Sequence, residues 1–88
     1  MKLIREPENK AVITTKYVVE NNSTITSVHY DEDGDWQFFG NEYITEDDAV
    51  VVSVKQILNI DATLNDIPEI HRGQIAIRTN KNSLWVLI

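Results

Sequence analysis

Three aspartates and one glutamate stand at the spacing of a calcium-binding loop. They are Asp31, Asp33, Asp35 and Glu42. Carboxylate oxygens at positions 1, 3, 5 and 12 are the ligands of an EF-hand loop. Position 6 is Trp36, however, where such a loop needs glycine for its sharp turn. The flanking residues alternate like strands instead of forming helical patterns. We therefore expect a solvated loop without a specific metal site.

Histidine and serine give no stronger indication of chemistry. His29 and His71 lie far apart in the chain, and neither belongs to an HExxH or His-x-His pattern. Ser53 stands at the expected start of a helix, and the chain has no GxSxG motif. Paired carboxylates are plentiful, but a glycosidase also needs a sugar-sized cleft between them. We expect a protein that is not an enzyme and holds no cofactor.

Negative charge is concentrated in one part of the chain. Residues 31–48 hold eight of the fourteen acidic residues and no Lys or Arg. The other residues hold six acids and eight bases, so the net charge of −6 is the sum of −8 in this stretch and +2 elsewhere. The same stretch contains the aromatic residues Trp36, Phe38, Phe39 and Tyr43. A field of this kind favours a basic partner.

Nucleic acid does not fit this charge distribution. The basic residues are scattered along the chain, and the sequence pI is about 4.7. Phosphate contacts drive nucleic-acid binding, and carboxylates beside Trp36 and Phe38 would repel a phosphate backbone. Core packing is the other interpretation of Trp36, Phe38 and Trp85, because alternate aromatic residues on a sheet usually face the core.

Length and composition predict a single small domain over 1–88. A chain of 88 residues buries roughly 60–65% of its unfolded surface and forms one modest core. The absence of cysteine suits a reducing cytoplasm. The N-terminus has no apolar h-region of signal-peptide length, and no stretch approaches the roughly 20 apolar residues of a membrane span. We expect an unprocessed cytoplasmic protein outside the membrane.

The segment 24–40 predicts a β-hairpin. Apolar and polar residues alternate on both sides of Asp33-Gly34, a pair typical of a type I′ turn with positive φ at both central positions. Four acids at this tip repel one another, and no basic residue lies near them in the sequence. Such repulsion is tolerable when water or a partner meets the acids. The candidate partner-binding residues are Asp31, Glu32, Asp33, Asp35, Trp36 and Glu42.

Two helices are expected around this hairpin. A strand at 11–15 precedes Thr15, which is placed to cap a short helix over 16–21; a continued strand is the alternative. Ser53 and Gln56 match a capping box, with apolar residues at helical spacing after them. This pattern predicts the main helix at about 54–60.

The remaining segments read as strands and turns. We expect a turn at 45–48, a short buried strand at 49–52 and a turn-rich connection over 62–73. Strands at 74–78 and 84–88 form a C-terminal hairpin. Strands at hairpin spacing around one main helix indicate an α+β fold, with a mostly antiparallel sheet of about five to six short strands.

A resemblance adds to this interpretation. The hairpin segment 29–40, HYDEDGDWQFFG, is followed by an acidic stretch, by Val51-Val52-Ser53 and by the run 57–61. Together these residues resemble a family of small uncharacterised bacterial domains, some of whose relatives are grouped with the immunity proteins of polymorphic toxin systems. The resemblance covers about 12–72. It implies a cytosolic bacterial protein with a binding role, and it transfers no catalytic residue.

Two functional hypotheses follow. In the first, the chain is a protein-binding module of the immunity type, whose acidic aromatic hairpin meets a basic protein. In the second, it is an accessory structural domain, a monomer or a weak homodimer that pairs through a sheet edge. The run 84–88 is apolar without alternation, so we expect both of its faces to be covered, by the core or by another subunit.

Overall fold

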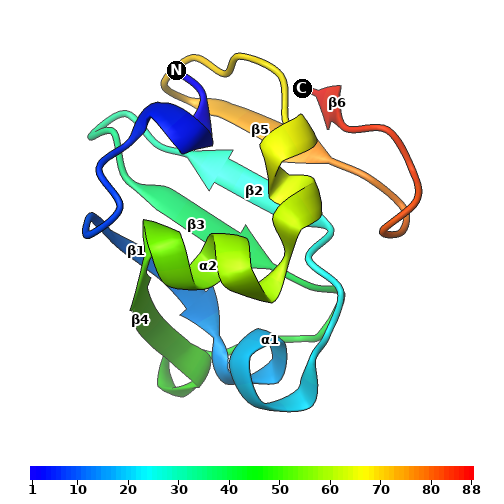
Figure 1. Ribbon diagram of the computed structural model, residues 1–88. Helices are drawn as coiled ribbons and strands as arrows, with labels where there is room; N and C mark the ends of the chain where they lie inside the picture. The colour runs from blue at the N-terminus through cyan, green and yellow to red at the C-terminus, as the bar shows by residue number, and fades with distance from the viewer.

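The computed structural model describes all residues, 1–88, as one six-stranded sheet with helices on one side (Figure 1). The strands are β1 (Ala11–Thr15), β2 (Ser27–Tyr30), β3 (Trp36–Phe39), β4 (Ala49–Ser53), β5 (Gln74–Ile77) and β6 (Val86–Leu87). The α-helices are α1 (Lys16–Asn21) and α2 (Val54–Ile60), and the 3₁₀ segments are η1 (Leu3–Arg5), η2 (Glu46–Asp48) and η3 (Ala62–Asp66). The strand order is β4-β1-β3-β2-β5-β6, and only β1 and β3 pair in parallel. The predicted α+β fold with a mostly antiparallel sheet is confirmed.

Both predicted helices form, and their caps explain where they begin. The Thr15 hydroxyl accepts a hydrogen bond from the Val18 N–H at 3.3 Å, and α1 ends at Asn22, whose φ is 60°. Ser53 and Gln56 form the predicted capping box, in which the Ser53 hydroxyl accepts from the Gln56 N–H at 3.1 Å. A cap of this kind stabilises a helix by about 1 kcal/mol. Neither helix has the length and apolar character that a bilayer span requires.

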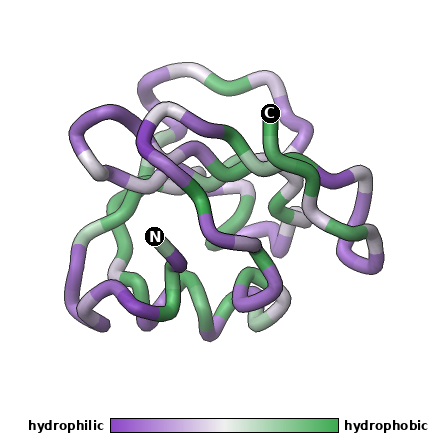
Figure 2. The backbone as a smooth tube through the Cα atoms, turned by 90° about the horizontal axis from the view of Figure 1, so that it is seen from above, coloured by the Kyte–Doolittle hydropathy of each residue, from purple (hydrophilic) through white to green (hydrophobic).

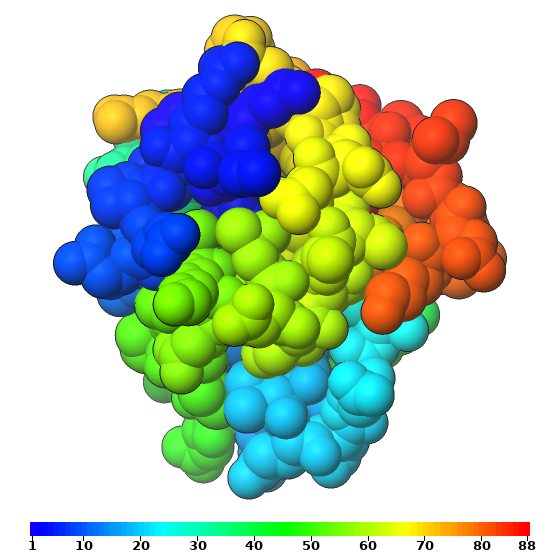
Figure 3. Space-filling model, viewed as in Figure 1, coloured from blue at the N-terminus to red at the C-terminus, as the bar shows by residue number.

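The core lies between the helices and one face of the sheet. Val28, Trp36 and Phe38 point into it from the two central strands, and Ile57 of α2 meets them from the other layer. Figure 3 shows this side of the molecule, where η1, α1, α2 and η3 close over the sheet. Figure 2, the view from above, shows hydrophobic and hydrophilic stretches alternating along the chain, which ends in a hydrophobic stretch at the C-terminus.

The two edge strands are more exposed than the sequence predicts. The pattern at 49–52 predicts a buried strand, but β4 is an edge strand in which Val51 is 68% exposed and Val52 is buried. The run 84–88 forms only a two-residue strand at the opposite edge. Trp85 packs into the core, whereas Val86 is 56% exposed. Both errors have one cause: helices cover only one face of the sheet.

Candidate functional site

The tip of the β2–β3 hairpin is a five-residue loop, 31–35, held by its own first residue. The Asp31 carboxylate accepts hydrogen bonds from the N–H groups of Asp33 and Asp35, at 2.9 and 3.0 Å. The Gly34 N–H donates to the Asp31 carbonyl at 3.0 Å, and Gly34 has a φ of 80°. Of the predicted pair, only Gly34 has a positive φ, so the predicted two-residue type I′ turn is wrong. The hairpin with its tip near Asp33-Gly34 does form.

The acids of this loop lie together at the surface. Ligand atoms of Asp31, Asp33 and Asp35 all lie within 4.8 Å of one another, and Glu32 is exposed beside them. We call Asp31, Glu32, Asp33 and Asp35 the acidic tip. One base does approach it: a guanidinium N–H of Arg72 donates to the Glu32 carbonyl at 3.5 Å. Arg72 thus reaches the tip from a distant part of the chain, although it contacts a backbone carbonyl and no tip carboxylate.

Glu42 does not join the acidic tip. One of its carboxylate oxygens accepts a hydrogen bond from the Ser23 hydroxyl at 2.7 Å. The other, Oε1, is buried without a partner. A Cβ added at Gly40 would lie only 2.6 Å from that oxygen, so glycine leaves room for the carboxylate. The twelve-residue calcium spacing in the sequence is thus not gathered into one site.

Trp36 belongs to the core and not to a surface. Its side chain is completely buried, its ring centroid lies 4.4 Å from that of Tyr30, and its Nε1–H donates to the Glu6 carboxylate at 2.7 Å. The inclusion of Trp36 among residues that contact a partner directly is therefore wrong. The core interpretation is correct, because Trp36 and Phe38 alternate onto the same covered face.

The other face of the sheet carries no helix. Strand register aligns one row of side chains across five strands and the residue after β6, and a second row crosses four strands. The first row is Val51, Ile13, Gln37, His29, Ile75 and Ile88, and the second is Phe39, Ser27, Ile77 and Val86. We call these ten residues the open face. None is acidic or basic apart from His29, and burial lowers the pKa of His29 below its usual 6.5, so the face is uncharged at neutral pH.

Two hollows join the acidic tip to the open face. One has a volume of about 320 Å³, and its lining includes Asp31, His29, Gln37 and Ile75. The other, of about 230 Å³, is lined by Ile13 and Val51 of the open face together with Asp35 and neighbouring residues. Carboxylates thus border an apolar, uncharged surface at one of its ends. Such an arrangement is suited to contact with another molecule.

The remaining candidates for catalysis are His29, His71 and Ser53. The His29 ring packs edge-on against Phe39 with centroids 5.4 Å apart, and its nitrogens make no hydrogen bond within the protein. His71 is exposed in the connection before β5, and Ser53 caps α2. No hydrogen bond joins a histidine side chain to a serine here.

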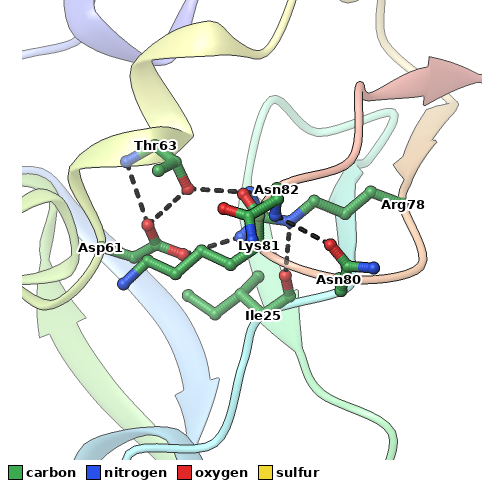
Figure 4. Close-up of polar contacts among 7 residues, drawn as sticks. All are labelled: Ile25, Asp61, Thr63, Arg78, Asn80, Lys81 and Asn82. Atoms are coloured by element: carbon green, nitrogen blue, oxygen red, sulfur yellow. Dashed lines mark hydrogen bonds and ion pairs between the residues drawn. The ribbon is translucent and has the colours of Figure 1, made fainter.

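A buried ion pair lies on the covered side of the sheet, and sequence analysis did not identify it (Figure 4). Arg78 donates to the Asp61 carboxylate at 2.7 Å, to the Thr63 hydroxyl at 2.7 Å and to the Ile25 carbonyl at 2.9 Å. Its guanidinium carbon lies 4.2 Å from the centroid of the Trp85 ring. These contacts tie together segments that are distant in sequence. An arginine within an alternating strand pattern was the available signal, since Arg78 takes an inward position.

The Asp61 carboxylate is held in its charged form. Burial raises the pKa of Asp61, but hydrogen bonds from Thr63 and the ion pair with Arg78 outweigh burial and hold the pKa below its usual 3.8. The charge is therefore retained in the fold down to a lower pH than in the unfolded chain. Both Asp61 oxygens and the Arg78 guanidinium have partners within the chain, so this network has a structural role.

No family model, curated protein or solved structure matches this chain.

Proposed function

We propose that the chain is a non-enzymatic protein-binding module whose open face and acidic tip together contact a basic protein. The observation that carries this proposal is an uncharged, partly apolar sheet face with carboxylates at one end. A helix layer covers the opposite face, and the fold places nothing over this one. An apolar centre with a charged border is the usual anatomy of a protein interface.

The open face supplies the apolar centre of the proposed interface. Phe39, Ile13 and Ile75 are half-buried there, and Val51 is 68% exposed. Aromatic and branched side chains near the middle of an interface supply most of its binding energy when a partner excludes water from them. Contact here would bury apolar surface without removing any charged side chain of the face from water. That favours a stable complex, because no desolvated charge opposes it.

The acidic tip supplies the charged border. Glu32, Asp33 and Asp35 are exposed, and they belong to the stretch that carries eight acids and no base. Charges at the rim of an interface act mainly on the association rate and on its salt dependence. The partner therefore carries basic side chains opposite the tip. Nucleic acid is excluded from this role, because its phosphates would meet carboxylates.

An immunity-type role is a specific form of this proposal. In it, the basic partner is a toxin domain, and the acidic tip and open face block a positively charged surface of that domain. The proposal includes a cytoplasmic location, which the absence of cysteine supports. The activity of the purified partner then shows whether the chain has this immunity-type role.

The test uses two variants that change the net charge equally. The tip variant is Glu32→Gln with Asp33→Asn and Asp35→Asn, and the control variant is Glu8→Gln with Glu20→Gln and Asp66→Asn. All six acids are exposed, and each variant removes three negative charges, so −6 becomes −3 in both. Asp31 is kept, because its carboxylate holds the loop backbone.

Proteins retained from a lysate of the native cells by the wild-type chain are purified, and their association rates with all three chains are measured at rising salt. A partner of the proposed interface is basic, associates about tenfold more slowly with the tip variant, and loses most of that difference at high salt. The control variant stays near the wild-type rate. Equal rates for the tip and control variants would contradict the role of the acidic tip.

A further inference from the structure

The final strand leaves an unpaired, apolar edge at the end of the sheet opposite β4. Leu84 is 88% exposed, Val86 56% and Ile88 64%, and register with β5 sets Val86 and Ile88 on the side of the open face. No residue between Leu84 and Ile88 carries a charge. Figure 3 shows this C-terminal segment projecting at the edge of the molecule. Exposed edges of this kind pair readily with another strand.

The free hydrogen-bonding groups of this edge follow from its register with β5. Ile75 and Ile88 exchange both of their backbone hydrogen bonds, at 3.2 and 2.8 Å. In an antiparallel ladder, the groups of alternate residues point to opposite sides of a strand. The N–H and C=O groups of Leu87, and of Trp85 just before the strand, therefore point away from β5. Each of the two residues presents one donor and one acceptor.

We propose that this edge binds a second copy of the chain, by antiparallel pairing of 84–88 about a two-fold axis at Val86. Trp85 of each copy then faces Leu87 of the second copy, and each such pair exchanges two backbone hydrogen bonds. The same register sets Leu84 against Ile88 of the second copy and brings the two Val86 side chains together. The pairing is self-complementary in both its backbone groups and its apolar side chains, as a two-fold interface requires.

The other sheet edge lacks this complementarity. In β4, the Ala49 N–H already donates to the Glu46 carbonyl, and the Ser53 N–H donates to the Gln56 side chain at 2.8 Å. The Val54 N–H donates to the Lys10 carbonyl, so alternation leaves Val51 as the main residue with free outward groups. Acids also precede β4 directly, in η2. A further strand is therefore expected to pair with β6 and not with β4.

The net charge of the chain gives this pairing its own dependence on salt concentration. Two copies of net charge −6 repel one another over long range, and salt screens that repulsion. Rising salt therefore strengthens self-association, whereas it weakens the proposed binding of a basic protein. The two proposals share Val86 and Ile88 at the border of the open face, but the pairing uses the backbone edge of β6, and the opposite salt dependence tells the two apart.

Sedimentation velocity over a concentration series up to about 1 mM tests the pairing, with two matched variants, Val86→Lys and Val51→Lys. Both valines are exposed on edge strands, so neither change disturbs the core. The wild type and Val51→Lys rise from 10.1 kDa towards twice that mass, and Val86→Lys stays monomeric because two lysines meet at the axis. A wild type that stays monomeric throughout, or a Val86→Lys variant that dimerises equally, overturns the proposal.

Amide hydrogen exchange locates the contact on the folded protein. The N–H groups of Trp85 and Leu87 exchange rapidly in dilute wild-type protein and become protected as its concentration rises. In Val86→Lys they exchange rapidly at every concentration. Self-association without this protection would place the dimer contact elsewhere and overturn the proposed register.

Discussion

The two faces of the sheet differ more in exposure to water than in the types of residue that they carry. Phe38 and Phe39 are neighbours of the same type, yet Phe38 is completely buried beneath the helices and Phe39 lies half-exposed on the open face. On the covered face even the charged Arg78 has every contact supplied from within the chain. On the open face, the apolar side chains contact one another and water. Contacts within the fold therefore satisfy the covered face, whereas the open face keeps apolar side chains in water.

Substitution of the two phenylalanines gives the largest expected contrast. Phe38→Ala removes a fully buried ring and is expected to lower the free energy of unfolding by about 3–5 kcal/mol. Phe39→Ala removes a ring that already meets solvent and is expected to cost about 1 kcal/mol. Urea denaturation followed by circular dichroism measures both values. Equal losses would mean that the open face contributes to the fold as strongly as the core does.

Replacement of Asp61 tests the buried ion pair of the covered face. Asp61→Asn is expected to lower the free energy of unfolding by about 1.5–3 kcal/mol at neutral pH, which is the range for a hydrogen bond to a charged group. The loss is expected because the amide cannot replace the carboxylate beside Arg78. Asp66→Asn is the control, since Asp66 is exposed in the neighbouring 3₁₀ segment and its replacement is expected to stay within about 0.5 kcal/mol.

The stability that the Asp61 charge contributes changes with pH in a defined direction. The folded pKa of Asp61 lies below its usual 3.8, so its contribution is complete above about pH 3.8 and is lost as the pH falls through the lower folded value. Asp48 acts in the same direction, because the Thr45 N–H and then Lys16 lower its pKa. Thermal unfolding at a series of pH values should show the wild type and Asp61→Asn converging in acid. A constant difference down to pH 2 would contradict the role of the Asp61 charge.

Local patterns predicted most of the fold. The capping residues Thr15 and Ser53 fixed the starts of both helices, and alternation around Gly34 located the hairpin. Local patterns do not encode which strand lies at an edge or which face the helices cover. The exposure of Val51 and Val86 was therefore missed, since both depend on the order of strands that are distant in sequence.

The candidate site was predicted only in part. The acidic tip is a local feature, and the acids of one short loop lie together in the fold as expected. Trp36 and Glu42 were separated from it by packing, and Arg72 was brought to it from the segment before β5. The open face was not identified, because its rows combine one or two residues from each strand. Register across the whole sheet creates such a surface.

Methyl chemical-shift mapping with the captured basic partner shows whether that partner covers the open face. The probes are Ile13, Val51 and Ile75 on the open face, with Ile4 and Val19 as exposed controls on η1 and α1. A partner that covers the open face shifts or broadens the signals of the first three residues and leaves those of the two controls unchanged. Changes confined to Ile4 and Val19 would place the partner on the helical side and contradict the account.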